Sequence, residues 1–385
     1  VWASLHVGDL RSAERQLAKV RTPSKDDRSP FTGTVLLARA FLAQARGGPE
    51  GMRQARKLAQ AEDPELRSKA HTLIGLAHWR EGRIQEATRA FDQFDREMRE
   101  IGDLRELVSA SHVLARLYRE AGRLTTARAF LEETRREIER SGTESSGPGG
   151  RGQDPRRYPG VADLHRELAE VLLDQGDLEG ASRALERSGE SVGSEVLLGW
   201  DYRDRITRAR MAAAEGNLDF GLTLMEEAEY RRFDTPLPIP ERPDAQKAEL
   251  ALIHGEWEEA VRWTQATEVA TETPVPYLRL HEGYVWARTL LLSDQERTSP
   301  LLRKLLASAR TYGARRVELR LLLLQTELLR QKGKESAAEQ ALLEAIQIAV
   351  PEHALGAFLE TSPADFAWLR DATRRVSGGV SGVAP

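Results

Sequence analysis

Apolar and small residues recur along the chain at helical spacing, in pairs of segments that meet at a glycine. Leu114 and Leu117 precede Gly122, and Leu124 and Ala127 follow it. Because positions three and four apart lie on one face of an α-helix, this spacing predicts an amphipathic helix on each side of the glycine. The expected unit is therefore a hairpin of two helices.

The hairpin pattern repeats along the whole chain, with a period of about 40 residues. A glycine is followed by an apolar residue two positions on and a small residue five positions on at Gly8, Gly82, Gly122, Gly176, Gly216, Gly255 and, more weakly, Gly333, with degenerate copies near Gly47 and Asp294. The glycine can adopt the left-handed conformation that ends the first helix, and the small residue lets the second helix approach the first. Such near-equal steps favour about nine repeat units over an irregular helical bundle.

These hairpins resemble tetratricopeptide repeats (TPRs), whose single units cannot bury their own apolar faces and stack to do so. The sequence predicts an all-α fold, a right-handed superhelical solenoid of about nine tetratricopeptide-like hairpins with a concave and a convex face. The register is supported by the seventh residue before each junction, which is small in every unit from the second to the ninth: Ala40, Gly75, Ala115, Ala169, Ala209, Ala248, Ala287 and Thr326.

One step between junctions is longer than the others, at about 54 residues. The extra residues fall in segment 141–160, which is rich in Gly, Ser, Pro and Arg and is predicted to be a flexible insertion loop. Its glycines do not form a phosphate-binding loop, because no apolar strand precedes them and no Gly-Lys-Ser/Thr follows. We expect residues 1–376 to form one superhelical sensor domain and residues 377–385 a flexible tail or linker.

Two sets of residues are predicted to line the concave wall. Six positions before the junctions, charges of alternating sign predict a structural ladder that neutralises itself: Arg116, Glu170, Arg210, Glu249, Arg288 and Glu327. Beside it, positions three, ten and thirteen before the junctions hold spare arginines, two histidines and aromatic surface, and give the candidate ligand-binding residues Trp79, His112, Arg119, Arg166, Arg203, His281 and Tyr284. This second set suits an anionic or hydroxyl-rich small molecule or a peptide; an Arg-rich solvated groove remains the alternative.

Composition narrows the function further. The 56 Lys and Arg residues nearly balance the 60 Asp and Glu residues, so the chain has no electrostatic footprint for nucleic acid. It has no cysteine, which fits a reducing compartment such as the cytoplasm, and no apolar run long enough for a membrane helix. No metal-binding or catalytic motif is present, so we expect no metal and no enzyme activity. The chain begins at Val1, as an excised piece of a larger protein would.

The last third of the sequence carries a family resemblance. Its segments include Tyr277-Leu278-Arg279, residues 287–291 (ARTLL) and residues 357–360 (AFLE). They are similar to the sensor region of the LuxR-type large ATP-binding transcriptional regulators, the MalT group. In that family the usual turn carries glycine where this chain has Ser293-Asp294-Gln295.

The resemblance implies a module between a nucleotide-binding switch and a helix-turn-helix, which senses a small-molecule inducer or a regulatory protein. It implies no cofactor in this chain, with ATP only if a separate nucleotide-binding domain exists in the full protein. Direct contact with nucleic acid or membrane is not expected of this segment, and self-association is possible. The alternative is a generic tetratricopeptide-type scaffold for protein–protein interaction without a small-molecule ligand.

Overall fold

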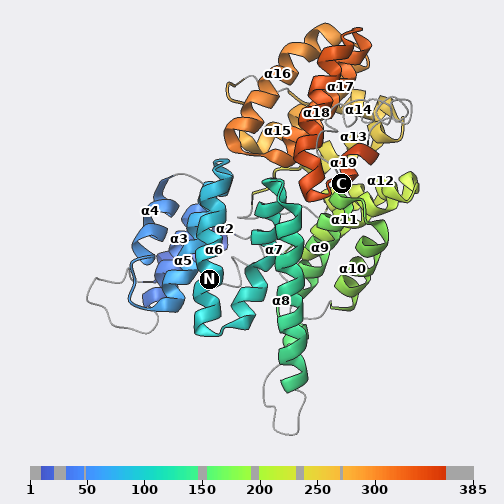
Figure 1. The fold of residues 1–385 in the computed structure, drawn as a ribbon. Helices are drawn as coiled ribbons and strands as arrows, with labels where there is room; N and C mark the ends of the chain where they lie inside the picture. Colours follow the sequence, from blue (N-terminus) through green and yellow to red (C-terminus); the bar gives the residue numbers. More distant parts are fainter. Residues whose placement is uncertain are drawn as a thin grey trace, which may run out of the picture.

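The described part of the chain consists of α-helices and three short 3₁₀-helices, without a strand (Figure 1). The computed structural model describes residues 10–20, 32–46, 49–145, 154–191, 199–230, 238–268 and 272–360. The α-helices are α2 (Leu10–Ala18), α3 (Thr32–Arg46), α4 (Pro49–Leu58), α5 (Pro64–Arg80), α6 (Ile84–Ile101), α7 (Leu104–Glu120), α8 (Leu124–Ser145), α9 (Val161–Gln175), α10 (Leu178–Glu190), α11 (Trp200–Ala214), α12 (Leu218–Tyr230), α13 (Pro243–Ile253), α14 (Trp257–Ala266), α15 (Leu280–Leu291), α16 (Gln295–Tyr312), α17 (Arg315–Gln331), α18 (Glu335–Ala349) and α19 (Gly356–Leu359). The 3₁₀-helices are η1 (Pro155–Arg157), η2 (Tyr277–Arg279) and η3 (Val350–Glu352).

The helices pair into hairpins at the predicted junctions. Eight complete hairpins run from α3–α4 to α17–α18 in the described residues, and α2 is the second helix of one more. The first junction, Gly8, and the segment before it lie outside the described residues, as does Gly47. The prediction of an all-α solenoid of tetratricopeptide-like hairpins is confirmed.

The junction glycines take the conformation for which glycine was expected. Their φ angles are positive, from 67° to 87°, at Gly82, Gly122, Gly176, Gly216, Gly255 and Gly333. The degenerate junction differs, since Asp294 has φ −149° and accepts a hydrogen bond from the Arg297 backbone N–H at 3.0 Å. There the chain replaces the left-handed turn with a side-chain cap on α16.

Small residues allow the two helices of each hairpin to touch. The alanines five positions after the junctions are completely buried: Ala13, Ala87, Ala127, Ala181, Ala260 and Ala338. In the third hairpin, a Cβ added to Gly75 would lie 2.6 Å from the Phe91 ring. A larger side chain at these positions would push the helices apart.

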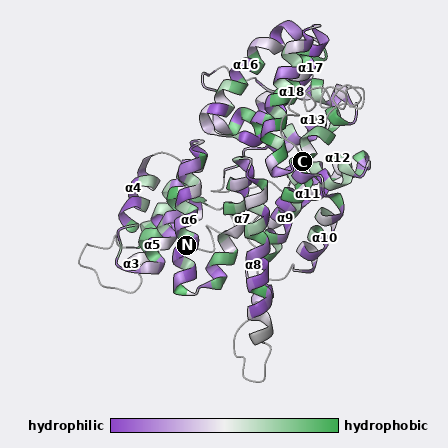
Figure 2. Ribbon diagram, viewed as in Figure 1, coloured by the Kyte–Doolittle hydropathy of each residue, from purple (hydrophilic) through white to green (hydrophobic). Residues whose placement is uncertain are grey.

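The hairpins stack through their first helices. Along the chain, α7 contacts α9, α9 contacts α11, α11 contacts α13, α13 contacts α15 and α15 contacts α17. Figure 2 shows hydrophilic and hydrophobic residues alternating within individual helices, as expected for helices that bury one side only. The first helices therefore form the inner wall of the superhelix.

The superhelix turns far enough to bring its C-terminal hairpins back onto the middle of the chain. Helix α17 contacts α7, and α19 contacts α9 (Figure 1). The Trp79 indole N–H donates to the Tyr277 hydroxyl at 3.1 Å across 198 residues of sequence, and the Thr125 hydroxyl donates to Glu352 at 2.7 Å across 227 residues. These contacts close the inner wall.

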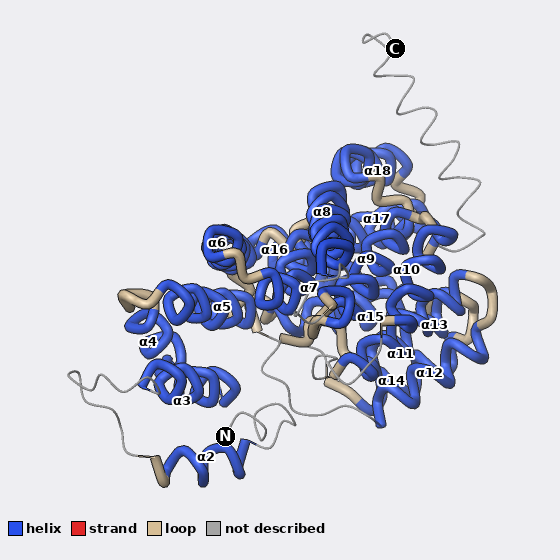
Figure 3. The backbone as a smooth tube through the Cα atoms, turned by 90° about the horizontal axis from the view of Figure 1, so that it is seen from below, coloured by secondary structure: helices blue, strands red, loops and turns tan. Residues whose placement is uncertain are grey.

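Two regions differ in how they are packed. Helices α2, α3 and α4, here called the arm, have two small apolar clusters. One is built on Leu17 and Leu42, and the other on Ala55 and Leu58, where it extends onto Leu73 of α5. Helices α5 to α19, here called the body, contain one large core that runs through most of the stack, with two smaller clusters beside it, one around Met225 and one around Met98. In Figure 3 the arm projects from one side, while α7 to α18 gather on the other.

The predicted insertion loop differs from the expectation at its two ends. Helix α8 continues to Ser145, and η1 begins after Asp154, whose carboxylate accepts from the Arg156 backbone N–H at 3.1 Å. Gly160 follows with φ 96° and packs against the backbone of Ser109. Residues 146–153 and the predicted tail 377–385 lie outside the described residues.

Candidate functional site

All seven candidate ligand-binding residues lie on the inner wall, and all are buried. None is more than 8% exposed: Trp79, His112, Arg119, Arg166, Arg203, His281 and Tyr284. This differs from the alternative of a solvated Arg-rich groove, because the returning C-terminal hairpins cover the wall. The arginines are also not spare, since carboxylates surround them.

The centre of the wall is a network around Asp174, near the end of α9. Asp174 accepts from both Nε (2.6 Å) and Nη2 (3.2 Å) of Arg316 on α17, which is 142 residues away in sequence. It also accepts from Arg119 at 3.2 Å and from Arg210 at 2.9 Å. Burial opposes ionisation of Asp174, but Arg316, Arg119 and Arg210 outweigh it and hold the pKa well below its ordinary value.

A second part of the network centres on Asp163, at the start of α9. Arg203 of α11 donates to it from Nε and Nη2, both at 2.9 Å, and Arg166 approaches the same carboxylate at 3.4 Å. Arg166 also donates to Glu167 at 3.0 Å. Burial opposes the charge on Asp163, but Arg203 leads the groups that lower its pKa. The pair joins α9 to α11 in the inner wall.

The third part joins α13, α15 and α17. Glu249 lies 2.8 Å from His281 Nε2 and accepts from Arg320 at 2.9 Å. Burial opposes its ionisation, but Arg320 and His281 lower the pKa of Glu249 to about 2. Arg320 also lies over the Tyr284 ring, 5.9 Å from its centroid, and burial raises the Tyr284 pKa.

The predicted charge ladder forms at one of its steps. Glu170 pairs with Arg210 of the next hairpin, as expected. At the other steps the closest partners differ: Glu249 pairs with His281 and Arg320, and Arg288 donates to the Tyr284 hydroxyl at 3.1 Å. Arg288 attracts Glu249 and Glu327 only at longer range, without a direct ion pair among the described residues. Among the described residues no ion pair joins Arg116 or Glu327 to a neighbouring ladder residue. The pairing differs from the prediction because the superhelix brings distant hairpins, and not only the next one, within reach of each charge.

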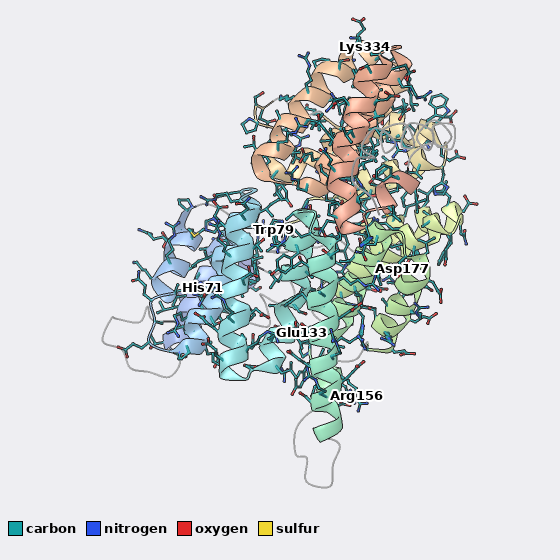
Figure 4. All side chains as sticks on the ribbon, viewed as in Figure 1. His71, Trp79, Glu133, Arg156, Asp177 and Lys334 are labelled. Atoms are coloured by element: carbon teal, nitrogen blue, oxygen red, sulfur yellow. The ribbon has the colours of Figure 1, made fainter. Side chains whose placement is uncertain are left out.

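Trp79 lies where the third hairpin approaches the C-terminal hairpins (Figure 4). Its indole N–H is bound to Tyr277, and the Arg116 guanidinium lies over its ring, 5.5 Å from the centroid. Such a cation over the face of an indole is attracted by the ring quadrupole. Trp79 therefore holds the closure of the superhelix as well as one side of the inner wall.

Sequence reasoning missed several residues of this network. Asp174, Glu241, Tyr277 and Arg316 were not candidates, although each is buried in it. Charged residues at buried positions of α9 and α17 were the available signal. Their partners could not be identified, because the contact between α9 and α17 depends on the superhelical turn.

The inner wall contains a small cavity of about 50 Å³. Arginines dominate its charged lining, which comprises Arg116, Arg119, Arg166, Arg203, Glu170 and Glu241. The remaining lining is mostly apolar or uncharged: Tyr202, Ile206, Pro238, Ile239 and Gln246. Of the seven candidate residues, Arg119, Arg166 and Arg203 line this cavity, whereas Trp79, His112, His281 and Tyr284 do not.

A larger groove of about 1010 Å³ lies outside, between the third and fourth hairpins and the last two. Its charged lining is balanced between four arginines and four acids: Arg89, Arg123, Arg310, Arg315, Asp92, Glu318, Glu344 and Glu352. Arg310 already pairs with Glu318 at 2.8 Å and with Glu344 at 2.7 Å. This outer groove has no excess of either charge.

Two further properties concern metals and membranes. No group of three or more His, Cys, Asp or Glu residues in the described ranges is placed to hold a metal ion. None of the described helices combines the length and the apolar character that crossing a membrane requires.

Comparison with known proteins agrees with this architecture. The family model described as the MalT-like TPR region matches residues 33–372. No curated protein sequence matches the chain. The fold is similar to that of a Rap protein complexed with Competence and Sporulation Factor, with a TM-score of 0.52 and 9% identity, covering 98% of this chain and 96% of that one. It is also similar to a chain in the APC/C hetero-tetramer Cut9–Hcn1, with a TM-score of 0.54 and 12% identity, covering 98% of this chain and 66% of that one.

Proposed function

The chain belongs to the MalT-like TPR family, and from this membership we propose that it is the effector-sensing and protein-interaction module of a bacterial LuxR/MalT-type transcriptional regulator. In this proposal it is not an enzyme, works in the cytoplasm and has no cofactor of its own. Any ATP would bind to a separate nucleotide-binding domain. It binds a small-molecule inducer or a partner protein on the concave face and thereby controls transcription.

The observation that carries this proposal is the closure of the inner wall. An interaction scaffold for long peptides needs an extended open groove, whereas a small-molecule sensor needs an enclosed site. Here Arg316 of α17 binds Asp174 of α9, and the cavity lies inside this closed part of the superhelix. This partly covered geometry supports a sensor.

The same geometry supplies a route for the signal. A ligand in the cavity touches α7, α9 and α11 on one side and the segment before α13 on the other. It shifts the equilibrium between closed and more open superhelices only if it binds one of them more tightly. Because small rotations per hairpin add along the stack, a modest change at the cavity moves the two ends of the chain apart or together.

Thermal unfolding against a panel of sugars, nucleotides, acyl compounds and peptides tests this function. A ligand at about 100 times its Kd stabilises the fold by about 2.7 kcal/mol. An Ile206→Phe variant, which fills the cavity without removing a charge, is expected to abolish the shift. Arg89→Gln in the outer groove is the control and is expected to keep it. If only Arg89→Gln lost the shift, the inner cavity would not be the sensor site.

The second candidate function is a protein-interaction scaffold without a small-molecule ligand. The outer groove favours it, because a volume of about 1010 Å³ with both charges suits a peptide segment. The similar Rap protein is complexed with Competence and Sporulation Factor, which is compatible with partner binding by this fold. The scaffold would be favoured by a peptide that raises the thermal unfolding temperature of the unmodified chain and of Ile206→Phe but not that of Arg89→Gln. Self-association belongs to the same proposal and would appear as a concentration-dependent mass in light scattering.

A further inference from the structure

We propose that the inner cavity accepts one anionic group, a carboxylate or a phosphate, and that Arg116 is the residue that binds it most directly. This inference rests on the proposed sensor function, because it names the chemical class of the effector for that same site. It is carried by the charge of the cavity lining, by one guanidinium that pairs with no carboxylate of the described residues, and by the size of the cavity.

The charges that face the cavity are unequal. Four guanidiniums line it, from Arg116, Arg119, Arg166 and Arg203, against two carboxylates. Glu241 is bound by Arg316, which does not line the cavity, and Glu170 is bound both by Arg210 outside the lining and by Arg119 within it, the latter at 3.2 Å. The lining therefore presents positive charge to whatever enters.

Carboxylates that do not line the cavity pair with three of its four arginines and so reduce its positive charge. Asp163, Glu167 and Asp174 pair with Arg203, Arg166 and Arg119. Glu120, another buried acid nearby, has a raised pKa because burial and then Glu241 disfavour its charged form. The Arg116 guanidinium has no such ion pair within the described residues, so it is the charge of this lining that a bound anion would neutralise.

Arg116 is the guanidinium left open. Within the described ranges no hydrogen bond or ion pair joins it to a carboxylate, and its Nε has no hydrogen-bond partner. Its contact is the Trp79 ring, 5.5 Å away, which orients the guanidinium without using its donors. A planar fork of free N–H donors held in this way matches the two oxygens of a carboxylate or phosphate.

His112 lies near two of these arginines, outside the lining of the cavity. It is 5% exposed, and neither ring nitrogen has a hydrogen-bond partner in the part of the chain that the structure describes. Burial, and beyond it the positive charges of Arg203 and Arg166, outweigh Asp163 and Glu167 and lower its pKa to about 4. Because burial is the main cause of this shift, His112 stays neutral at pH 7 and adds no charge of its own beside Arg203 and Arg166.

The size of the cavity limits the ligand to a small group. A water molecule needs roughly 10–15 Å³ of such space, so about 50 Å³ holds only a few waters. The covered part of this space suits a carboxylate or phosphate group rather than a whole sugar chain or nucleotide. The apolar side chains of Ile206, Pro238 and Ile239 line the same space and suit a short carbon chain. The expected effector is a small organic acid or a phosphate ester.

Isothermal titration of the purified chain with matched probes tests the proposal. Butanoate and its neutral counterpart butanamide form one pair, and inorganic phosphate and methyl phosphate form the second arm, which distinguishes the two sources of negative charge. We expect an anion to bind at least about 10-fold more tightly than butanamide, and more weakly at high salt. Arg116→Gln should weaken binding about 10-fold or more, and Arg116→Lys should weaken it less.

Arg183→Gln is the matched control, since Arg183 is an exposed arginine of α10 that pairs with Glu179 of its own helix. It should bind the anion as the unmodified chain does. Unchanged thermal unfolding without ligand would show that Arg116→Gln still folds. Equal binding of butanoate and butanamide, no binding of any anion, or unchanged affinity in Arg116→Gln would each overturn the anion proposal. If the anion proposal failed but a neutral sugar or a peptide still shifted thermal unfolding, the sensor function would stand. If no compound of any charge shifted thermal unfolding, the anion proposal and the sensor function would both fail.

Discussion

The arm and the body are built from the same hairpin, but they hold it together differently. In the arm, apolar contacts are confined to small clusters, and the pair Arg46–Glu14 is about half exposed on both sides. In the body, one large apolar core runs through most of the stack, and Arg119 and Glu167 are 2% and 0% exposed in their ion pair. The body also has contacts between hairpins far apart in sequence, such as Arg316 with Asp174.

The difference shows what closure adds to a repeat protein. A linear stack gains stability from each hairpin and its nearest neighbours. A superhelix that returns on itself also buries its inner wall, so charged residues there lose water and need partners. Those partners constrain the geometry of the closed form, and they make the body sensitive to the loss of a single charge.

The largest effect is expected from Asp174→Ala in the body. The change removes the buried carboxylate that Arg316, Arg119 and Arg210 all contact, and breaking a buried pair in this way costs about 3–5 kcal/mol. The urea midpoint of unfolding measures it. Glu14→Ala in the arm should leave the midpoint of the body unchanged, because its partner Arg46 is exposed. Equal effects of the two variants would contradict the distinction between the regions.

The next effect concerns apolar cores. Leu305→Ala removes a completely buried side chain from the large core and should cost about 2–5 kcal/mol. Amide hydrogen exchange followed by mass spectrometry should then show faster exchange throughout α15–α18. Leu17→Ala should speed exchange in α2 and α3 only, because its cluster is local. Faster exchange in the body of Leu17→Ala would show that the arm and body unfold together.

Two glycine substitutions should have the opposite order of effects, with a larger loss of stability in the arm than in the body. A Cβ on Gly51 of the arm would lie 2.7 Å from the backbone N of Gln44, which cannot move aside, so Gly51→Ala should destabilise the arm by about 1–3 kcal/mol. A Cβ on Gly283 of the body meets the end of the flexible Leu305 side chain at 2.4 Å, so Gly283→Ala should cost less. Limited proteolysis of the arm and urea unfolding of the body measure the two effects. A larger loss in Gly283→Ala would mean that Leu305 is held rigidly.

The last comparison concerns the pH dependence of stability. Burial lowers the pKa of His112 to about 4 from its ordinary 6.5. Between these values the unfolded chain binds a proton that the folded body does not, so stability falls as pH decreases from 6.5 to 4. His112→Leu should flatten the urea midpoint over this range. The arm, residues 10–58, has no histidine, so its exchange protection should show no histidine-linked change there.

The acid side of the profile has a different origin. Arg210 and Arg119 outweigh burial and lower the pKa of Glu170 to about 2. Because the folded-state pKa of Glu170 is lower than its ordinary value of 4.5, ionised Glu170 stabilises the fold at pH values above 4.5. This stabilisation is lost as the pH falls toward 2. If the urea midpoint of His112→Leu still fell steeply with decreasing pH above 4.5, another histidine would be responsible. His165 is the next candidate, because burial also lowers its pKa to about 4.

The sequence by itself determined the local architecture. Glycines that can take positive φ set the junctions, and small residues at fixed distances from them set the helix-to-helix approach, as Gly82 and Ala87 illustrate. These are short-range properties of the backbone and of side-chain volume, so they can be predicted without knowing the rest of the fold. The inner-wall position of Arg119 and Arg203 followed from the same register.

The tertiary structure alone decided which charges meet. The predicted ladder assumed that each charge pairs with the next hairpin, which holds for Glu170 and Arg210. Asp174 meets Arg316 across 142 residues because the superhelix turns through enough angle to close. That angle is the sum of small rotations between hairpins, and each depends on side-chain packing that a repeat pattern does not encode. The burial of the wall and the excess charge of its cavity are consequences of that sum.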